Sequence, residues 1–256
     1  MQNNPALKAA ARRNTKKAEP KRRKRKVSIL EKIIRDKMPE VERLEEEYDL
    51  IEYVEAALEA PECRDFRAAI KGTEKLSLIA EVKKASPSAG IIREDFDPVA
   101  LAKSYEQAGA NAISVLTEEN YFQGKLEYIQ MVKEATSLPV LRKDFITDEY
   151  QIAQSKLAGA DAILLICAVL DWRRLLSLLN LTRRFGMESL VEVHNTRELD
   201  IALIAGATLI GINNRDLKTF EVDLDATENL TTHIHDPFPV VSESGISKPE
   251  DLQKVK

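Results

Sequence analysis

The sequence predicts an α/β fold, a (β/α)8 TIM barrel with extra N-terminal helices, of which this chain carries seven βα units. Seven short apolar, β-rich runs follow one another with starts about 19 to 35 residues apart, and helical segments separate them. Several runs are apolar nearly throughout, as in parallel strands that are covered on both faces. Polar residues follow almost every run. An open doubly wound sheet also fits the alternation, but regular units with polar strand ends favour a barrel.

The first segment, residues 1–27, is strongly basic, and we expect it to be a disordered tail. It holds 11 Lys and Arg and one acid, Glu19, whereas the whole chain has a net charge of −4. Its polybasic run, residues 21–26, is suited to nucleic acid or to an anionic surface. A solvated tail is the simpler interpretation, so nucleic-acid binding is not expected to be the function.

Residues 28–256 are expected to form the barrel domain, which begins with three helices. Ser28 and Glu31 have the spacing of a capping box, and apolar residues recur at helical spacing as far as Leu44, with a kink expected at Pro39. A second helix is expected over residues 50–60 and a third over residues 65–70. These helices precede the first strand and read as an addition to the barrel.

The strands are then expected at 76–82, 111–116, 139–141, 161–166, 189–193, 208–212 and 239–241. Three Ala-Gly-Ala joints, centred on Gly109, Gly159 and Gly206, lie between a helix and a strand, where glycine can take the left-handed conformation that ends a helix. Further helices are expected to begin at Asp97-Pro98 and near Ser247. An eighth strand is not seen, which predicts two unpaired sheet edges. Either the natural protein continues, or another chain fills the gap, or the barrel is incomplete.

The composition is that of an ordinary globular protein, with 44% hydrophobic and 31% charged residues. No stretch reaches the roughly 18 apolar residues of a membrane span. The two cysteines, Cys63 and Cys167, are too few for a disulfide scaffold, and a reducing cytoplasm fits them best.

Charged side chains at the strand ends are the candidates for chemistry. Glu81 and Lys83 share one side of the first strand, because side chains alternate along it. If that side is the lumen, they share a low-dielectric mouth with Lys143 and Glu192. Burial and neighbouring charges can then separate the pKa values of these groups into an acid and a base. Surface charges or a structural ion pair are the alternative interpretation.

Other strand-end residues are weaker candidates. Asn213 and Arg215 act either on a ligand or as loop caps, and Ser244-Gly245 is either a turn or a phosphate site. The three histidines, His194, His233 and His235, show no metal-ligand spacing, so no metal is predicted. His194 shares the alternation of Glu192 but receives no role.

Together these strand-end motifs resemble those of the indole-3-glycerol phosphate synthase family, in the same order and over about residues 28–256. The motifs are Glu81-Val82-Lys83-Lys84-Ala85-Ser86-Pro87-Ser88, Leu116-Thr117-Glu118, Tyr121-Phe122-Gln123-Gly124, Lys143-Asp144-Phe145, Leu190-Val191-Glu192-Val193-His194, Gly211-Ile212-Asn213-Asn214-Arg215-Asp216-Leu217 and Ser242-Glu243-Ser244-Gly245-Ile246.

The resemblance implies a lyase of tryptophan biosynthesis that needs no metal or organic cofactor. Such an enzyme converts 1-(2-carboxyphenylamino)-1-deoxyribulose 5-phosphate to indole-3-glycerol phosphate with loss of CO2 and water. The implied partners are this phosphorylated small molecule and other tryptophan-pathway enzymes, with no membrane. The family's last strand and short helix, which supply half of its phosphate site, are not matched in this chain.

By resemblance, each candidate receives an expected role. Lys143 matches the general acid, Glu192 the general base, Lys83 the second lysine and Glu81 its partner. The positions that match substrate contacts are Asn213, Arg215, Ser86, Phe122, Phe145 and Glu243, and those that match the phosphate site are Ser244 and Gly245.

Two other readings stay open at this point. One is another sugar-phosphate barrel enzyme, such as a phosphoribosyl isomerase or an aldolase that forms a Schiff base through Lys143. The other is an inactive incomplete barrel or fragment, with RNA binding by residues 1–27 as a variant of it.

Overall fold

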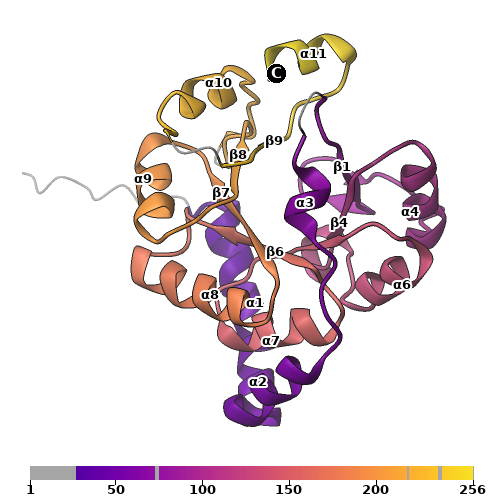
Figure 1. Ribbon diagram of the computed structural model, residues 1–256, viewed down its shortest axis with the longest axis vertical. Coiled ribbons are helices and arrows are strands. Elements are labelled where there is room, and N and C mark those ends of the chain that lie inside the picture. Colours follow the sequence, from indigo (N-terminus) through magenta and orange to yellow (C-terminus); the bar gives the residue numbers. More distant parts are fainter. Residues whose placement is uncertain (1–26, 73–74, 218, 236–237, 256) are drawn as a thin grey trace, which may run out of the picture.

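The computed structural model describes residues 27–72, 75–217, 219–235 and 238–255, so the predicted basic tail lies outside the described residues apart from Val27. Seven parallel strands form the main sheet, in the order β1-β4-β5-β6-β7-β8-β9. The sheet curls into an arc with helices along its outer side (Figure 1). The predicted barrel architecture with seven βα units is therefore confirmed. The strands are β1 (Ile79–Val82), β4 (Ala112–Leu116), β5 (Val140–Lys143), β6 (Ala162–Ile166), β7 (Glu188–Val193), β8 (Ile210–Asn213) and β9 (Val240–Glu243).

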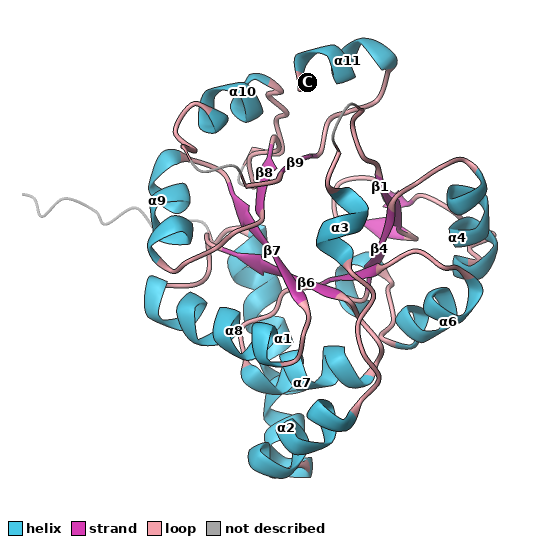
Figure 2. Cartoon of the chain, in the orientation of Figure 1, coloured by secondary structure: helices cyan, strands magenta, loops and turns pink. Residues whose placement is uncertain are grey.

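Each strand is followed by one or two helices, which Figure 2 shows along the outside of the arc. These helices are α4 (Pro98–Gln107), α5 (Glu119–Phe122), α6 (Glu127–Ala135), α7 (Glu149–Leu157), α8 (Trp172–Arg184), α9 (Thr196–Ile204), α10 (Asp225–Thr231) and α11 (Pro249–Lys254). Several begin at a side chain that accepts hydrogen bonds from the first free amides, as Asp97 does for α4 and Asp171 for α8. The joints before the strands are also as predicted, since Gly109, Gly159 and Gly206 have φ values of 89°, 90° and 83°.

The three predicted N-terminal helices are present as α1 (Ile29–Glu47), α2 (Leu50–Glu59) and α3 (Phe66–Ile70). The capping box at Ser28 is confirmed: Ser28 Oγ accepts from the Glu31 amide at 3.1 Å, and the Glu31 carboxylate accepts from the Ser28 amide at 2.9 Å. Helix α1 continues through Pro39. Because α2 and α1 pack on α7, the N-terminal addition covers one side of the barrel.

Two apolar cores hold the sheet in place. The larger core lies between the strands and the outer helices and includes Ile113, Val115, Ile163 and Leu178. The smaller core fills the inside of the arc, where Phe66 and Ile70 of α3 pack against lumen-facing side chains of the strands. Its strand members are Ala112, Leu141, Ala162, Leu164, Ile166, Leu190 and Leu209. Helix α3 thus closes the lumen at the end where the strands begin.

The observed elements differ from the predicted ones near the strand ends. Strand β1 begins at Ile79 instead of Leu76, because Leu76 and Leu78 lie before the paired region and are about half exposed (50% and 54%). Strands β8 and β9 extend to Asn213 and Glu243, so these side chains belong to the sheet. A small antiparallel pair, β2 (Ala85–Ser86) and β3 (Gly90–Ile91), follows β1 and was not predicted.

Candidate active site

Four strands, β1, β5, β7 and β9, change from apolar to charged side chains on the lumen side near their ends. Because side chains alternate along a strand, residues two apart face the same way. In these four strands, a lumen-facing residue that belongs to the smaller core or packs on it is followed, two positions later, by a charged side chain. The successive pairs are Ile79 and Glu81, Leu141 and Lys143, Leu190 and Glu192, and Val241 and Glu243. The strand register stacks these charges at one end of the barrel, the end where βα barrels hold their active sites.

Lys143, the last residue of β5, is the central cation of this layer. Its Nζ contacts the Glu243 carboxylate and lies 3.7 Å from Glu192 Oε2. Burial opposes the positive charge, but attraction to Glu243, Glu192 and Glu81 outweighs it and raises the pKa of Lys143. The amine is therefore a protonated ammonium, able to give a proton to a bound ligand.

Glu192, on β7, is a buried carboxylate that remains ionised. Burial alone would raise its pKa, but His194 and Lys143, with a hydrogen bond from Asn213, lower the pKa to about 2. Its Oε1 lies 3.2 Å from His194 Nε2, while its Oε2 is the atom nearest Lys143. The layer therefore holds an ionised base beside a protonated acid.

Glu81 and Lys83 form a second ion pair at the end of β1, as their shared face predicts. Lys83 Nζ contacts Glu81 Oε1, and both side chains are about one-third exposed. Glu81 also contributes to the raised pKa values of Lys143 and Glu243, which places all five groups in one electrostatic environment. The layer thus contains two lysines and three glutamates.

Glu243 fits into the layer only because β8 carries a glycine beside it. A Cβ at Gly211 would lie 2.2 Å from Glu243 Oε1, far inside contact distance. Within the described part of the chain, this Oε1 is buried and has no hydrogen-bond donor. Burial raises the pKa of Glu243, and repulsion from Glu192 raises it further. The attraction to Lys143 lowers the pKa but does not outweigh these two effects. Glu243 is expected from the resemblance to contact substrate, and its side chain here holds Lys143.

The predicted aromatic residues lie beside each other next to this layer. The ring centroids of Phe122, on α5, and Phe145, after β5, are 6.0 Å apart. The short helix α5 was not predicted; it forms because the Glu118 carboxylate accepts hydrogen bonds from three amides of that turn. The pair offers an apolar wall to an aromatic ligand.

Of the three remaining predicted contact residues, Asn213 borders Glu192 and Glu243, whereas Arg215 and Ser86 lie in the segments that follow β8 and β1. Asn213 Oδ1 accepts from the Arg215 amide at 3.0 Å, and the Arg215 guanidinium donates to the Phe220 carbonyl at 3.1 Å. Ser86 Oγ accepts from the Ala89 amide at 3.2 Å, within the turn between β2 and β3. Arg215 and Ser86 therefore hold their own loops.

The predicted phosphate turn has an unusual backbone. Ser244 and Gly245 have φ values of 68° and 82°, although Ser244 has a Cβ that disfavours this region. Asn214 stabilises the turn by donating to the Ser244 carbonyl at 3.2 Å. Strain of this kind concentrates at functional sites, and it occurs where β9 ends beside Glu243.

A buried network behind Lys143 was missed by the sequence analysis. Lys37 of α1 places its Nζ 2.9 Å from Asp144, and Arg142 binds the same carboxylate at 2.9 Å. Burial opposes the charge of Asp144, but Arg142 and Lys37 hold its pKa well below the usual range. The network attaches α1 to the residue that follows Lys143. A lysine on the apolar stripe of α1, between Ile33 and Val41, is the signal that was available.

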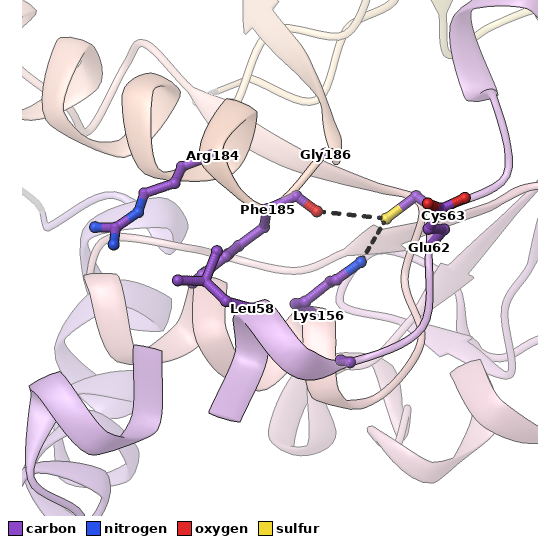
Figure 3. Close-up of a pocket in the computed structure, with 8 residues that line it drawn as sticks. Leu58, Glu62, Cys63, Lys156, Arg184, Phe185 and Gly186 are labelled. Atoms are coloured by element: carbon purple, nitrogen blue, oxygen red, sulfur yellow. Dashed lines mark hydrogen bonds between the residues drawn. The ribbon is translucent and has the colours of Figure 1, made fainter. Parts of the chain in front are cut away.

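A cavity of about 400 Å³ lies elsewhere, beside Cys63 and Lys156 (Figure 3). Lys156 Nζ lies 3.2 Å from Cys63 Sγ, which also contacts the carbonyls of Ala160 and Phe185 at 3.6 and 3.9 Å. Those carbonyls precede β6 and β7, so the cavity is at the end of the barrel where strands begin. Active sites of βα barrels lie at the other end, which favours the charged layer.

Comparison with known proteins identifies a family that the chain resembles over most of its length. Residues 30–256 match the family model described as Indole-3-glycerol phosphate synthase. The chain is 49% identical over 228 residues to "Indole-3-glycerol phosphate synthase" of Alkaliphilus metalliredigens (strain QYMF), covering 89% of this chain and 87% of the relative. It is 50% identical over 232 residues to the protein of the same name from Dehalococcoides mccartyi (strain ATCC BAA-2266 / KCTC 15142 / 195), covering 89% of each.

The fold is also similar to that of a solved structure of low sequence identity. The N-acetylmannosamine-6-phosphate 2-epimerase from Clostridium perfringens superposes with a TM-score of 0.58 at 17% identity, covering 75% of this chain and 85% of that chain. At this identity the likeness concerns the fold alone.

Proposed function

Because the chain belongs to the indole-3-glycerol phosphate synthase family, we propose that its layer of two lysines and three glutamates performs the acid–base steps of indole ring formation. The protein is a lyase of tryptophan biosynthesis. It converts 1-(2-carboxyphenylamino)-1-deoxyribulose 5-phosphate to indole-3-glycerol phosphate, CO2 and water. The roles of individual residues follow from the chemistry that this conversion requires.

Ring closure needs an acid at the ribulose carbonyl. The ring carbon that bears the carboxylate attacks the carbonyl carbon, and the carbonyl oxygen takes a proton as the new C–C bond forms. Lys143 is suited to donate this proton, since its raised pKa keeps it protonated before the substrate binds. The same charge state argues against an aldolase, because a Schiff base requires a neutral amine.

The following steps restore aromaticity and need a base. The C–C bond to the carboxylate breaks, CO2 leaves, and its electron pair returns to the ring. The new hydroxyl then leaves as water with a second proton, while the adjacent carbon loses a proton to Glu192. Glu192 is suited to accept it, because its lowered pKa keeps the carboxylate ionised. One proton is consumed overall, since the carboxylate departs as neutral CO2.

Substrate binding is assigned to the residues around this layer. Lys83 pairs with Glu81, and its positive charge would attract the substrate's carboxylate. Phe122 and Phe145 would flank its aromatic ring, and the amides of the turn at residues 244–245 would receive its phosphate. Asn213, Arg215, Ser86 and Glu243 lie on the strand and loop segments around the mouth and are further proposed contacts.

The observation that supports these roles most directly is that Lys143 contacts carboxylates from two other strands, Glu192 and Glu243. The test is turnover of the anthranilate-ribulose substrate, followed by the fluorescence of the indole product. We expect Lys143→Ala and Glu192→Gln to lose at least about a hundredfold in kcat, the usual contribution of a general acid or base. Circular dichroism should show an unchanged fold.

A matched control is Lys125→Ala, which removes an exposed lysine that is paired only with Glu127 on the surface. Its kcat should equal that of the unmodified protein. Turnover that is undiminished in Lys143→Ala or in Glu192→Gln would contradict the assigned roles.

The location of the enzyme is a separate matter. None of the described helices combines the length and apolar character needed to cross a membrane. We propose the cytoplasm as its location, because both cysteines are free and the family is biosynthetic. Fractionation of cells that express a tagged protein would test this.

A further inference from the structure

His194 lies between two carboxylates: its Nδ1 hydrogen-bonds Glu198, and its Nε2 forms a close ion pair with Glu192. Its Nε2 is 3.2 Å from Glu192 Oε1, and its Nδ1 is 3.0 Å from Glu198 Oε2. The imidazole side chain is 12% exposed, and the Glu192 side chain is 4% exposed. The ring therefore spans from the charged layer of the barrel to the start of α9.

Glu198, the carboxylate on the outer side of His194, is firmly held. Glu198 Oε2 also accepts from the His194 amide at 2.9 Å, and Glu198 Oε1 accepts from Asn195 Nδ2 at 2.7 Å. Asn195 in turn caps α9 by accepting from the Glu198 amide at 3.0 Å. The helix N-terminus thus locks Glu198, and Glu198 sets the plane and position of the imidazole.

The inner carboxylate has a different cation at each oxygen. Glu192 Oε1 faces His194, while Glu192 Oε2 faces Lys143 at 3.7 Å. If Lys143 moves toward a substrate, the buried Glu192 carboxylate is not left wholly unpaired, because His194 still lies 3.2 Å from its Oε1. His194 would still hold Oε1 and so keep the carboxylate from rotating.

We propose that His194 is a positioning residue for the reaction: with Glu198 behind it, it holds Glu192 Oε1 so that Oε2 faces the reacting atoms. This inference rests on the proposed role of Glu192 as the base. The arrangement is that of a base held by a charged neighbour on the side away from the substrate. His194 would touch no reacting atom.

The charge of His194 supports this role. Each ring nitrogen of His194 faces a carboxylate oxygen, at 3.2 Å for Nε2 and 3.0 Å for Nδ1, and two such anionic neighbours favour the imidazolium form. Burial opposes that charge, but Glu192 and Glu198 outweigh burial and raise the pKa of His194 to about 10. The other groups that act on Glu192 are Lys143, Glu243, Cys167 and the amide of Asn213. His194 therefore supplies a fixed positive charge beside the base.

The experiment compares two amide replacements that differ in reach. A glutamine amide nitrogen extends to about the place of imidazole Nε2, whereas an asparagine amide nitrogen extends only to that of Nδ1. His194→Gln thus keeps a donor for Glu192 without the charge, and His194→Asn loses the donor to Glu192. The matched control is His233→Gln, which changes an exposed histidine beyond the end of α10.

We expect His194→Asn to lower kcat about tenfold or more, with KM within about twofold, because orientation of the base acts mainly on the chemical step. His194→Gln should recover most of that loss. In both variants the acid limb of the kcat–pH profile should move to higher pH, by about 1 to 3 units, because Glu192 loses a neighbouring cation. His233→Gln should match the unmodified protein in both measurements.

The alternative is that His194 only fastens β7 to α9. In that case the unfolding temperature would shift in both variants. The value of kcat, measured well below that temperature, and the acid limb of the pH profile would both be unchanged. That result would overturn the inference. Equal kcat in the Gln and Asn variants would overturn it as well. Failure of the base assignment is distinguishable, since Glu192→Gln would then keep turnover.

Discussion

Gly211→Ala, which adds a single methyl group, is expected to lower kcat on the order of a hundredfold. Gly211 lies in β8, and its φ is not in the left-handed region, so alanine fits its backbone. The new Cβ would lie 2.2 Å from Glu243 Oε1 and 3.2 Å from Leu190 Cδ1. Ordinary contact begins at about 3.4 Å, so the carboxylate must move by roughly 1.2 Å, the difference between these distances.

Glu243 holds Lys143, and this shift therefore misplaces the proposed acid. A misplacement of about 1 Å can cost on the order of a hundredfold in rate, or about 2.7 kcal/mol of transition-state stabilisation. The assay is kcat from product fluorescence at saturating substrate. Gly109→Ala is the control: its Cβ meets nothing within 4 Å, so its strain at φ 89° should lower stability while kcat is kept.

A double-mutant cycle shows whether the effect passes through Glu243. In a Glu243→Ala background the added methyl group has no carboxylate to displace, so Gly211→Ala should cost little further activity. If Gly211→Ala retains full kcat, or if its cost is the same in both backgrounds, the explanation by displacement of Glu243 is wrong.

Three further predictions concern stability and reactivity. Lys37→Met should lower the free energy of unfolding by about 2–3 kcal/mol, because Asp144 loses one of its two buried cations. Urea denaturation measures this change. An unchanged urea midpoint would show that the Lys37–Asp144 pair adds nothing to stability. His194 has a raised pKa of about 10, so its stabilising effect is fully present below pH 6.5 and is lost as pH rises through 10. The difference in Tm between the unmodified protein and His194→Gln should accordingly shrink between these values, and a difference that grows with pH would contradict the sign. Burial raises the pKa of Cys167 to about 12, so iodoacetamide at pH 8 should label it only after unfolding, as peptide mass spectrometry would show.

Much of the charged layer could be predicted from the sequence because two simple regularities govern it. Alternation along a strand puts Glu81 with Lys83, and parallel strands bring their carboxyl ends to one edge. Those rules predict that Lys143 and Glu192 share the mouth, and their separation of 3.7 Å agrees. Neither rule needs the loops to be known.

The loops and the long-range contacts could not be predicted in the same way. The Arg215 guanidinium bonds the Phe220 carbonyl, a geometry that depends on how one loop folds back on itself. Lys37 and Asp144 are 107 residues apart and meet only after α1 has packed on the barrel. Gly211 was visible as a glycine inside an apolar strand, a sign of close approach, but its neighbour Glu243 comes from another strand.

Helix α3 limits how molecules can reach the charged layer of the barrel. Phe66 is 1% exposed and, with Ile70, seals the lumen against Leu141 and Leu190 beneath the charged layer. Molecules therefore cannot reach the charged layer through this end of the lumen, and the segments after the strands border the opposite end. Changes to those segments can alter which substrates bind. The smaller apolar core beneath the charged layer keeps bulk water away from the buried charges.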